Sequence, residues 1–263
     1  MNRSEKQSSA TPSPRGSTPK TPENNSESTD NSREFFEKKL VSERKRTTNA
    51  RSKELPPITD DEKPFEIPKG WKWIRLGNVI QYTENLDIQK KLQPDEIVNY
   101  VDIDSIDNNK YKIESPKEKY VSELSSRARR VLKQGFIIYS TVRPYLCNMA
   151  IIEEQKKNFI GSTGFNVFKP IYLNIHYIFN FFLSPYVINL YKSMMQGFNS
   201  PSINNDQFEN TIVPLPPLKE QEEIVNKVES LLGKVTELEN QIQERKQLSE
   251  KLVFGVIKEK LER

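Results

Sequence analysis

The most regular pattern of apolar and polar positions in this chain lies near its C-terminus. Apolar residues recur there at alternating spacings of four and three, with a polar interruption at Arg245 and Ser249; the members of this seam are Ile224, Val228, Leu231, Val235, Leu238, Ile242, Leu252 and Val256. The spacing is the a/d pattern of a coiled coil. It predicts one helix over residues 218–263, about 65 Å long at the usual rise per residue. The apolar face of such a helix requires a partner helix.

Three prolines immediately precede this helix. Pro214, Pro216 and Pro217 fall within four positions, and each lacks a main-chain N–H and restricts the residue before it. They predict a sharp end to the preceding element, so that a compact module is joined to a long helix by a short rigid segment.

The pattern over residues 61–217 predicts that this module is one α+β domain. Runs of β-branched and aromatic residues bounded by turn-forming residues predict strands at 97–103, 136–141, 148–152 and 164–168. Helical spacing occurs over 173–196, with a break at Pro185, and a short helix is expected over 203–208. Strands and helices that alternate irregularly favour an α+β arrangement over a regular parallel sheet.

The two N-terminal segments differ in composition from the domain. Half of residues 1–32 are Ser, Thr or Pro, and none is Leu, Ile, Val or aromatic. We expect this tail to be disordered, because it cannot bury enough apolar surface to offset the entropy of ordering. Residues 33–60 have a short apolar stripe followed by many basic residues, which predicts a basic helix and a linker. The helix would either contact phosphates or present a solvated face, the commoner role of a charge run.

The overall composition limits the classes of protein that the chain can belong to. The net charge is +4 and 29% of the residues are charged, which is compatible with nucleic-acid binding but not diagnostic of it. The single cysteine, Cys147, excludes an internal disulfide framework and fits a reducing compartment. The most apolar stretch, 171–190, contains too many polar residues for a membrane span. We expect a soluble, cytoplasmic protein without a membrane partner.

Candidates for catalysis are weak. The only histidine, His176, lies in an apolar stretch without a partner motif, so neither a zinc site nor a Cys/His nucleophile pair is expected. Asp102 and Asp104 alternate along a predicted strand and could hold Mg²⁺, but a solvent-facing strand end is the commoner role of such residues. The sequence contains no phosphate-binding glycine loop. It therefore predicts a protein without catalytic residues, bound metal or cofactor.

The remaining basic and polar residues are suited to reading DNA. Lys and Arg contact phosphates, while Arg, Asn, Ser and Thr can also contact base edges. A turn between Gly161 and Gly164 is expected to expose Ser162 and Thr163, and a polar loop is expected around residue 199. The predicted contacts to double-stranded DNA are Arg127, Arg129, Arg130, Lys133, Arg143, Tyr145, Ser162, Thr163, Asn199, Ser200 and Asn204.

Three segments, in the same order, resemble parts of the specificity subunits of type I restriction–modification systems. They are LPPITDDEKPFEIPKGWKWIRLGNV at 55–79, VLKQGFIIYSTVRPYLCNMAII at 131–152 followed by GSTGFNVFKP at 161–170, and PLPPLKEQEEIVNKVESLL at 214–232. The third segment is similar to the junction of a target-recognition domain and a spacer helix. One residue departs from the family pattern, since Phe136 follows Gly135 where an acidic residue is usual.

The resemblance implies a DNA-specificity subunit without catalytic activity, with a target-recognition domain over 61–217 and a spacer and dimerisation helix over 218–263. Such a chain would bind one half of a bipartite DNA site and pair with a second copy or with another half-subunit. A methyltransferase subunit and a restriction (translocase–nuclease) subunit are the further partners implied, and they would bring S-adenosylmethionine and ATP. Two other interpretations remain open: a coiled-coil adaptor with a protein-binding head, and a fragment of a fused restriction enzyme.

Overall fold

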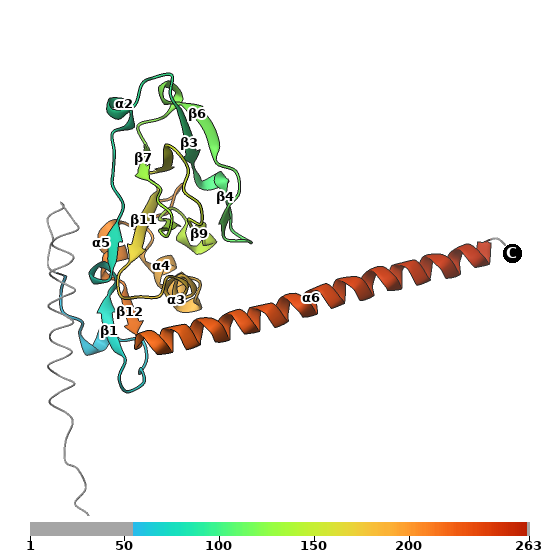
Figure 1. Cartoon of the computed structure of the whole chain (residues 1–263). Helices are drawn as coiled ribbons and strands as arrows, with labels where there is room; N and C mark the ends of the chain where they lie inside the picture. The colour runs from blue at the N-terminus through green and yellow to red at the C-terminus, as the bar shows by residue number, and fades with distance from the viewer. Residues whose placement is uncertain (1–54, 262–263) are drawn as a thin grey trace, which may run out of the picture. The chain divides into compact units, whose positions relative to one another are not determined.

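A computed structural model describes residues 55–261 of the chain (Figure 1). The tail expected at 1–32 and most of the basic segment expected at 33–60 lie outside the described residues. The predicted α+β class is confirmed, because a domain rich in β-strands is followed by one long helix, α6 (Leu218–Leu261).

The first of two larger sheets has four strands. In spatial order they are β6 (Lys117–Tyr120), β3 (Ile97–Val101), β10 (Phe159–Ser162) and β7 (Ala128–Val131). β10 pairs parallel with β3 and antiparallel with β7, and β3 pairs antiparallel with β6. Two short helices, α2 (Ile88–Lys91) and η4 (Val121–Glu123), contribute Ile88 and Val121 to a buried cluster with Val98 and Ile160 of this sheet.

The second sheet is antiparallel throughout. Its strands, in spatial order, are β2 (Ile80–Tyr82), β11 (Phe165–Pro170), β8 (Ile137–Ser140) and β9 (Met149–Ile151). Only Thr163 and Gly164 separate β11 from β10 of the first sheet. The two sheets are therefore joined at this turn. Shorter elements connect the strands: η1 (Asp60–Glu62), η2 (Leu76–Asn78), η3 (Ile103–Ser105), β4 (Ile106–Asp107), β5 (Lys112–Ile113) and η5 (Pro144–Leu146).

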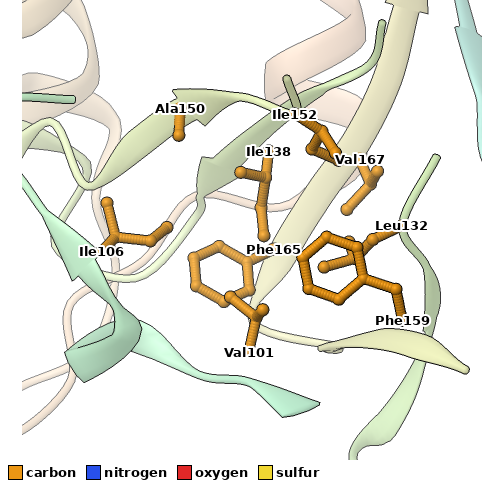
Figure 2. Close-up of a cluster of buried hydrophobic side chains, with 9 residues drawn as sticks. All are labelled: Val101, Ile106, Leu132, Ile138, Ala150, Ile152, Phe159, Phe165 and Val167. Atoms are coloured by element: carbon orange, nitrogen blue, oxygen red, sulfur yellow. The ribbon is translucent and has the colours of Figure 1, made fainter. Parts of the chain in front are cut away.

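A buried apolar cluster draws side chains from strands of both sheets (Figure 2). Phe165 and Val167 are alternate residues of β11 and both belong to this cluster, as the two-residue period of a strand requires. Burying a side chain of this size stabilises the fold by about 1.5–3 kcal/mol. The cluster consists of Val101, Ile106, Leu132, Ile138, Ala150, Ile152, Phe159, Phe165 and Val167.

Three helices pack an aromatic cluster against the sheet of β8 and β11. They are α3 (Ile175–Phe182), α4 (Pro185–Met194) and α5 (Asn205–Asn210). Phe182 and Phe208 stack with centroids 5.5 Å apart and an interplanar angle of 4°, and both contact Phe168 of β11. The predicted break in the 173–196 helix is confirmed, because Ser184 caps α4 and Pro185 is its first residue. Proline is favoured at this position, where no donor is needed.

The beginning and the end of the domain are paired with each other. β1 (Lys72–Arg75) and β12 (Ile212–Leu215) form an antiparallel pair in which Trp73 lies opposite Pro214. The sequence analysis predicts no strand at β12, because the prolines indicate only the end of the preceding element. A proline is tolerated in β12 because this strand has one neighbour only, so its missing N–H can face away from the ladder.

The turn that departs from the family pattern is closed by main-chain bonds. Gly135 has a φ of +78°, a left-handed conformation that glycine adopts without strain. The N–H of Gly135 donates to the carbonyl of Ile152 over 2.9 Å, and the N–H of Phe136 donates to the carbonyl of Lys133 over 3.2 Å. The turn therefore forms without an acidic side chain at position 136.

Candidate nucleic-acid interface

The turn between β10 and β11 is the meeting point of several loops. The main-chain N–H and the hydroxyl of Thr141 both donate to the carbonyl oxygen of Gly164, each over 3.0 Å. The N–H of Thr163 donates to the carbonyl oxygen of Arg127 over 2.8 Å. The segment that precedes β7 and the segment that follows β8 are therefore fastened to the same turn.

A fourth loop, residues 196–202, is bonded to this group. Gln196 and Ser202 exchange two main-chain N–H···O bonds of 3.0 Å. Ser202 also forms an isolated antiparallel β-bridge with Val142. Arg143 adds a bond from its N–H to the carbonyl of Pro201 (2.7 Å) and one from Nη2 to the carbonyl of Asn199 (3.2 Å). We call the four loops, residues 125–128, 141–146, 162–164 and 196–202, the loop cluster.

Arg143 occupies an unusual main-chain conformation within the loop cluster. Its φ is +47°, in the left-handed region that few residues other than glycine adopt. The neighbouring Pro144 starts η5, and the side chain of Arg143 is exposed. Residues held in such conformations concentrate at functional sites, since the surrounding bonds must offset the strain. The bonds to Asn199 and Pro201 provide that restraint here and hold an exposed guanidinium in place.

The loop cluster contains no acidic residue. Between Glu123 and Asp206 the only acidic residues are Glu153 and Glu154. These two follow β9, whose Ile151 pairs with Ile137 at the start of β8, whereas the loop cluster lies beyond the other end of β8. The guanidinium groups of Arg127 and Arg143 therefore lie in loops without opposing carboxylates, which favours binding of a polyanion.

Two predicted DNA contacts have structural roles in the described chain. Ser162 is buried, and its hydroxyl oxygen accepts a bond from the N–H of Gly164 over 3.3 Å. The expectation that the turn exposes Ser162 is therefore wrong, while Thr163 is half-buried. The side chain of Asn204 accepts a bond from the N–H of Gln207 over 2.8 Å. It caps α5, although the residue itself is exposed.

The basic residues predicted as one cluster lie in different places. Arg129 and Arg130 are successive residues of β7, so their side chains point to opposite faces of the sheet. Nε of Arg129 donates to the carbonyl of Ser126 over 2.8 Å, beside the loop cluster. Nε of Arg130 is buried and has no hydrogen-bond partner among residues 55–261, and burial lowers the pKa of this guanidinium. Lys133 precedes β8, at the end away from the loop cluster, and pairs with Glu84 over 2.7 Å.

Two residues of this region were not among the predicted contacts. Lys192 of α4 is exposed and lies near Cys147, where its charge partly offsets the rise that burial causes in the pKa of the thiol. Phe198 is fully exposed within loop 196–202. A phenylalanine between Gly197 and Asn199 in a polar loop was the sequence signal for it. Tyr145 is half-buried in η5.

The acidic pair that could have held a metal has a structural explanation. Lys117 lies 2.7 Å from the carboxylate of Asp102 and 3.8 Å from that of Asp104. Burial opposes ionisation of Asp102, but the bonds from Lys117 and Ser105 outweigh it and hold its pKa below the ordinary value. Over residues 55–261, His, Cys, Asp and Glu side chains form no group of three that could hold a metal ion. No helix within the same residues is long and apolar enough to cross a membrane.

The first turns of α6 are fixed to the domain. Gln221 is fully buried; its Oε1 accepts from the N–H of Asn174 over 2.7 Å and its Nε2 donates to the carbonyl of Pro216 over 2.9 Å. Val225, one turn later, is also buried. The direction in which α6 leaves the domain is therefore set by side-chain contacts as well as by the prolines.

The apolar seam of α6 becomes exposed after its third turn. Ile224 and Val228 are half-buried, whereas the side chains described from Glu229 onward are all exposed. The next seam residues, Leu231 and Val235, are 50% and 49% exposed. Leu238, Ile242 and Leu252 are still more exposed. An exposed apolar stripe of this kind on a helix, interrupted at Arg245 and Ser249, is the geometry of a helix-pairing surface.

Comparison with known proteins identifies the family. The model of the type I restriction modification DNA specificity domain matches residues 68–246, from just before β1 into the exposed part of α6. This chain belongs to that specificity family. The matched range includes the loop cluster and the first half of the exposed seam, so both features lie within the family domain.

Individual relatives agree with this membership. The chain is 29% identical over 197 residues to the EcoAI specificity subunit of a type I restriction enzyme from Escherichia coli, covering 73% of this chain and 33% of that protein. The EcoEI specificity subunit, also from Escherichia coli, is 28% identical over 197 residues, with 73% and 32% covered. The specificity chain thus spans about a third of the length of these curated relatives.

Two solved structures share the fold. The crystal structure of the HsdS subunit from Thermoanaerobacter tengcongensis has a TM-score of 0.60 and 39% identity, covering 67% of this chain and 46% of that one. A chain from a structural study of complex assembly and conformational transition of the type I R-M system has a TM-score of 0.59 and 38% identity, with the same coverage. The specificity chain therefore matches slightly less than half of each solved chain.

Proposed function

We propose that this specificity-family chain is a DNA-recognition subunit whose domain binds one half of a bipartite site on double-stranded DNA. The observation that carries the proposal is the loop cluster, in which four loops without acidic residues present Arg127 and Arg143. Arginines supply phosphate affinity and can read guanine, while Asn, Ser and Thr can contact other base edges. The DNA contacts proposed within or beside the loop cluster are Arg127, Arg129, Arg143, Tyr145, Thr163, Asn199 and Ser200.

The chain would act without catalysis of its own. Asp102, the better placed of the two candidate carboxylates, is engaged by Lys117 and Ser105, so its bonds are those of a turn cap. Methyl transfer and cleavage would then belong to a methyltransferase subunit and a restriction subunit that dock on this chain and bring S-adenosylmethionine and ATP. Such a complex would act on cellular DNA in the cytoplasm.

The exposed part of α6 would pair with a second helix. The domain does not cover the side chains of Leu231, Val235 and Leu238, which are about half exposed. Their heptad spacing fits an α-helical partner. We propose an antiparallel pair, formed with a second copy or with another half-subunit, that holds two recognition domains apart at a fixed distance.

Salt-dependent DNA binding tests the proposal. The full chain is titrated against random and site-containing duplexes at several salt concentrations, the site being found by mapping methylation in host DNA with and without the protein. Phosphate contacts give a linear fall in the logarithm of affinity with the logarithm of salt concentration. Affinity that does not depend on salt, or methylation that does not depend on this chain, would refute the DNA-recognition role.

The exposed seam of α6 also fits a second function, a coiled-coil adaptor whose globular head binds protein. The same titration separates the two functions, because an adaptor has no phosphate contacts and shows no salt slope on duplex DNA. An adaptor would keep its partner after the charges of the loop cluster are removed.

A further inference from the structure

Phe198 is the most exposed large apolar side chain in the described part of the chain. Its relative exposure is 105%, against 50% for the strand residues Ile97 and Tyr120. Several other aromatic rings of the domain pack against one another, as Phe182 and Phe208 do. Covering a fully exposed phenyl ring with another molecule lowers the free energy. The exposure of Phe198 at one defined point therefore indicates a binding role.

The loop that carries Phe198 is short and restrained at its base. The paired main-chain bonds between Gln196 and Ser202 close residues 196–202 into a small hairpin. Gly197 has a φ of +100°, which glycine adopts without strain. After Phe198 in the chain, the carbonyl groups of Asn199 and Pro201 accept bonds from Arg143. The ring is therefore presented next to a restrained arginine and not on a free tail.

We propose that Phe198 contacts the bases of bound DNA directly. This inference rests on the proposed function, to which it adds a base-contacting residue. Duplex DNA offers two apolar surfaces to a phenyl ring: the base faces, reached when the ring inserts into the stack, and the methyl group of thymine in the major groove. Arg143 beside the ring would hold a phosphate and bring the ring to the bases.

The surroundings of the ring favour DNA over a protein partner. The next residues in the loop are Asn199 and Ser200, which can bond base edges or phosphates. All four loops of the cluster lack acidic residues. Loops with arginines and without acidic residues, beside one aromatic ring, match the alternation of phosphate and base along a DNA groove.

The sharpest test uses the fact that a phenyl ring is uncharged. Phe198→Ala should weaken binding of the full chain to its site by roughly tenfold or more, the usual effect of losing one aromatic contact to a base. The slope of affinity against salt should stay unchanged, because no phosphate contact is lost. The unfolding temperature should also stay unchanged, because the ring is fully exposed. Phe254→Ala is the matched control, since Phe254 is 71% exposed on α6, outside the recognition domain.

Two probes then identify the mode of base contact. If the ring inserts into the stack, 2-aminopurine placed at one step of the site should brighten with the wild-type chain and not with Phe198→Ala. If the ring covers a thymine methyl group, replacing that thymine by uracil should weaken wild-type binding and leave Phe198→Ala unaffected. Either response supports direct contact.

Three results would overturn the inference without touching the proposed function. Phe198→Ala could bind as tightly as the wild type, or lose affinity without a response at any probe position. It could also lose affinity for a methyltransferase subunit while it keeps its affinity for DNA, which would assign the ring to a protein interface. Failure of the wild-type chain to bind DNA would instead refute the proposed function itself.

Discussion

The indole Nε1 of Trp71 donates a hydrogen bond to the carboxylate of Glu220 over 2.6 Å, across 149 positions of the chain. Trp71 stands immediately before β1, and Glu220 lies in the first turn of α6. The neighbouring Gln221 is bonded to Asn174 and Pro216. Side chains and main-chain groups from three parts of the domain therefore meet at the start of the helix.

Removing the amide of Gln221 should destabilise this junction. Gln221→Ala leaves the N–H of Asn174 without its acceptor in a part-buried position, so we expect the free energy of unfolding to fall by about 1–3 kcal/mol. Urea unfolding followed by the fluorescence of Trp71 and Trp73 measures the change. Glu222→Ala, at an exposed position in the same turn, is the control. Equal midpoints for the two variants would show that the amide has no such role.

The stability of the N-terminal edge of the domain should depend on pH through Glu62. Its carboxylate lies 2.8 Å from Nη1 of the nearly buried Arg75, and bonds from Arg75 and Thr59 lower the pKa of Glu62 from 4.5 to about 2. A pKa lowered on folding contributes stability above the unfolded value, and that stability is lost as the pH falls towards the folded value. The difference in unfolding midpoint between wild type and Glu62→Gln should therefore be full at pH 7 and shrink between pH 4.5 and 2. Asp61→Asn, at the exposed neighbour, is the control substitution. A pH-independent difference for Glu62→Gln would contradict the assignment.

Burial on both faces makes β8 predictable from the sequence. Ile137 and Ile138 of β8 are both buried. Because both faces of the strand are covered, its sequence is a continuous apolar run. β6 could not be found in this way, because Lys117–Tyr120 is an edge strand with half of its side chains in water. Its pairing depends on Val98 and its neighbours in β3, which are distant in sequence.

The candidate site was predictable in its residue types and loops but not in the burial of each residue. Arg143 and Asn199 were expected in separate loops, and the structure joins them through one hydrogen bond. Arg130 resembles Arg129 in sequence, yet it points into the protein because one face of β7 is covered. Which face is covered follows from the pairing of β7 with β10, a tertiary contact that local spacing does not encode.

Charge removal in the loop cluster should change the salt dependence of DNA binding. Arg127→Ala should lower affinity for every duplex and reduce the salt slope by about one unit, as loss of one phosphate contact does. Lys169→Ala serves as the control, because Lys169 is exposed near the far end of β11.

Arg130→Ala should lower the unfolding temperature instead, since its side chain is largely inside the domain. Titrations at four or more salt concentrations distinguish these effects; an unchanged slope for Arg127→Ala would remove this residue from the interface.

Self-association should depend on the exposed seam of α6. Leu231→Asp with Leu238→Asp places two charges in the proposed helix–helix contact, so the chain should sediment as a monomer at micromolar concentration while its domain stays folded. Leu232→Asp is a matched control, because Leu232 is equally exposed but lies outside the seam. Wild-type chain that sediments as a clean monomer, without partners, would count against a homodimer.

The symmetry of the complex should appear in the DNA site. Two copies paired through antiparallel α6 helices are related by a two-fold axis, so the site should be an interrupted palindrome with halves of a few base pairs. Inserting seven residues after Glu229 keeps the heptad register and moves each domain about 10 Å from the axis. The gap should then lengthen by up to roughly six base pairs, while the half-sites stay unchanged, which methylation mapping would reveal. Inserting four residues at the same place leaves the spacing of the seam from Leu231 onward unchanged and should lengthen the gap by proportionally less. An asymmetric site would refute the homodimer and indicate pairing with a different half-subunit, because two identical domains must read identical halves.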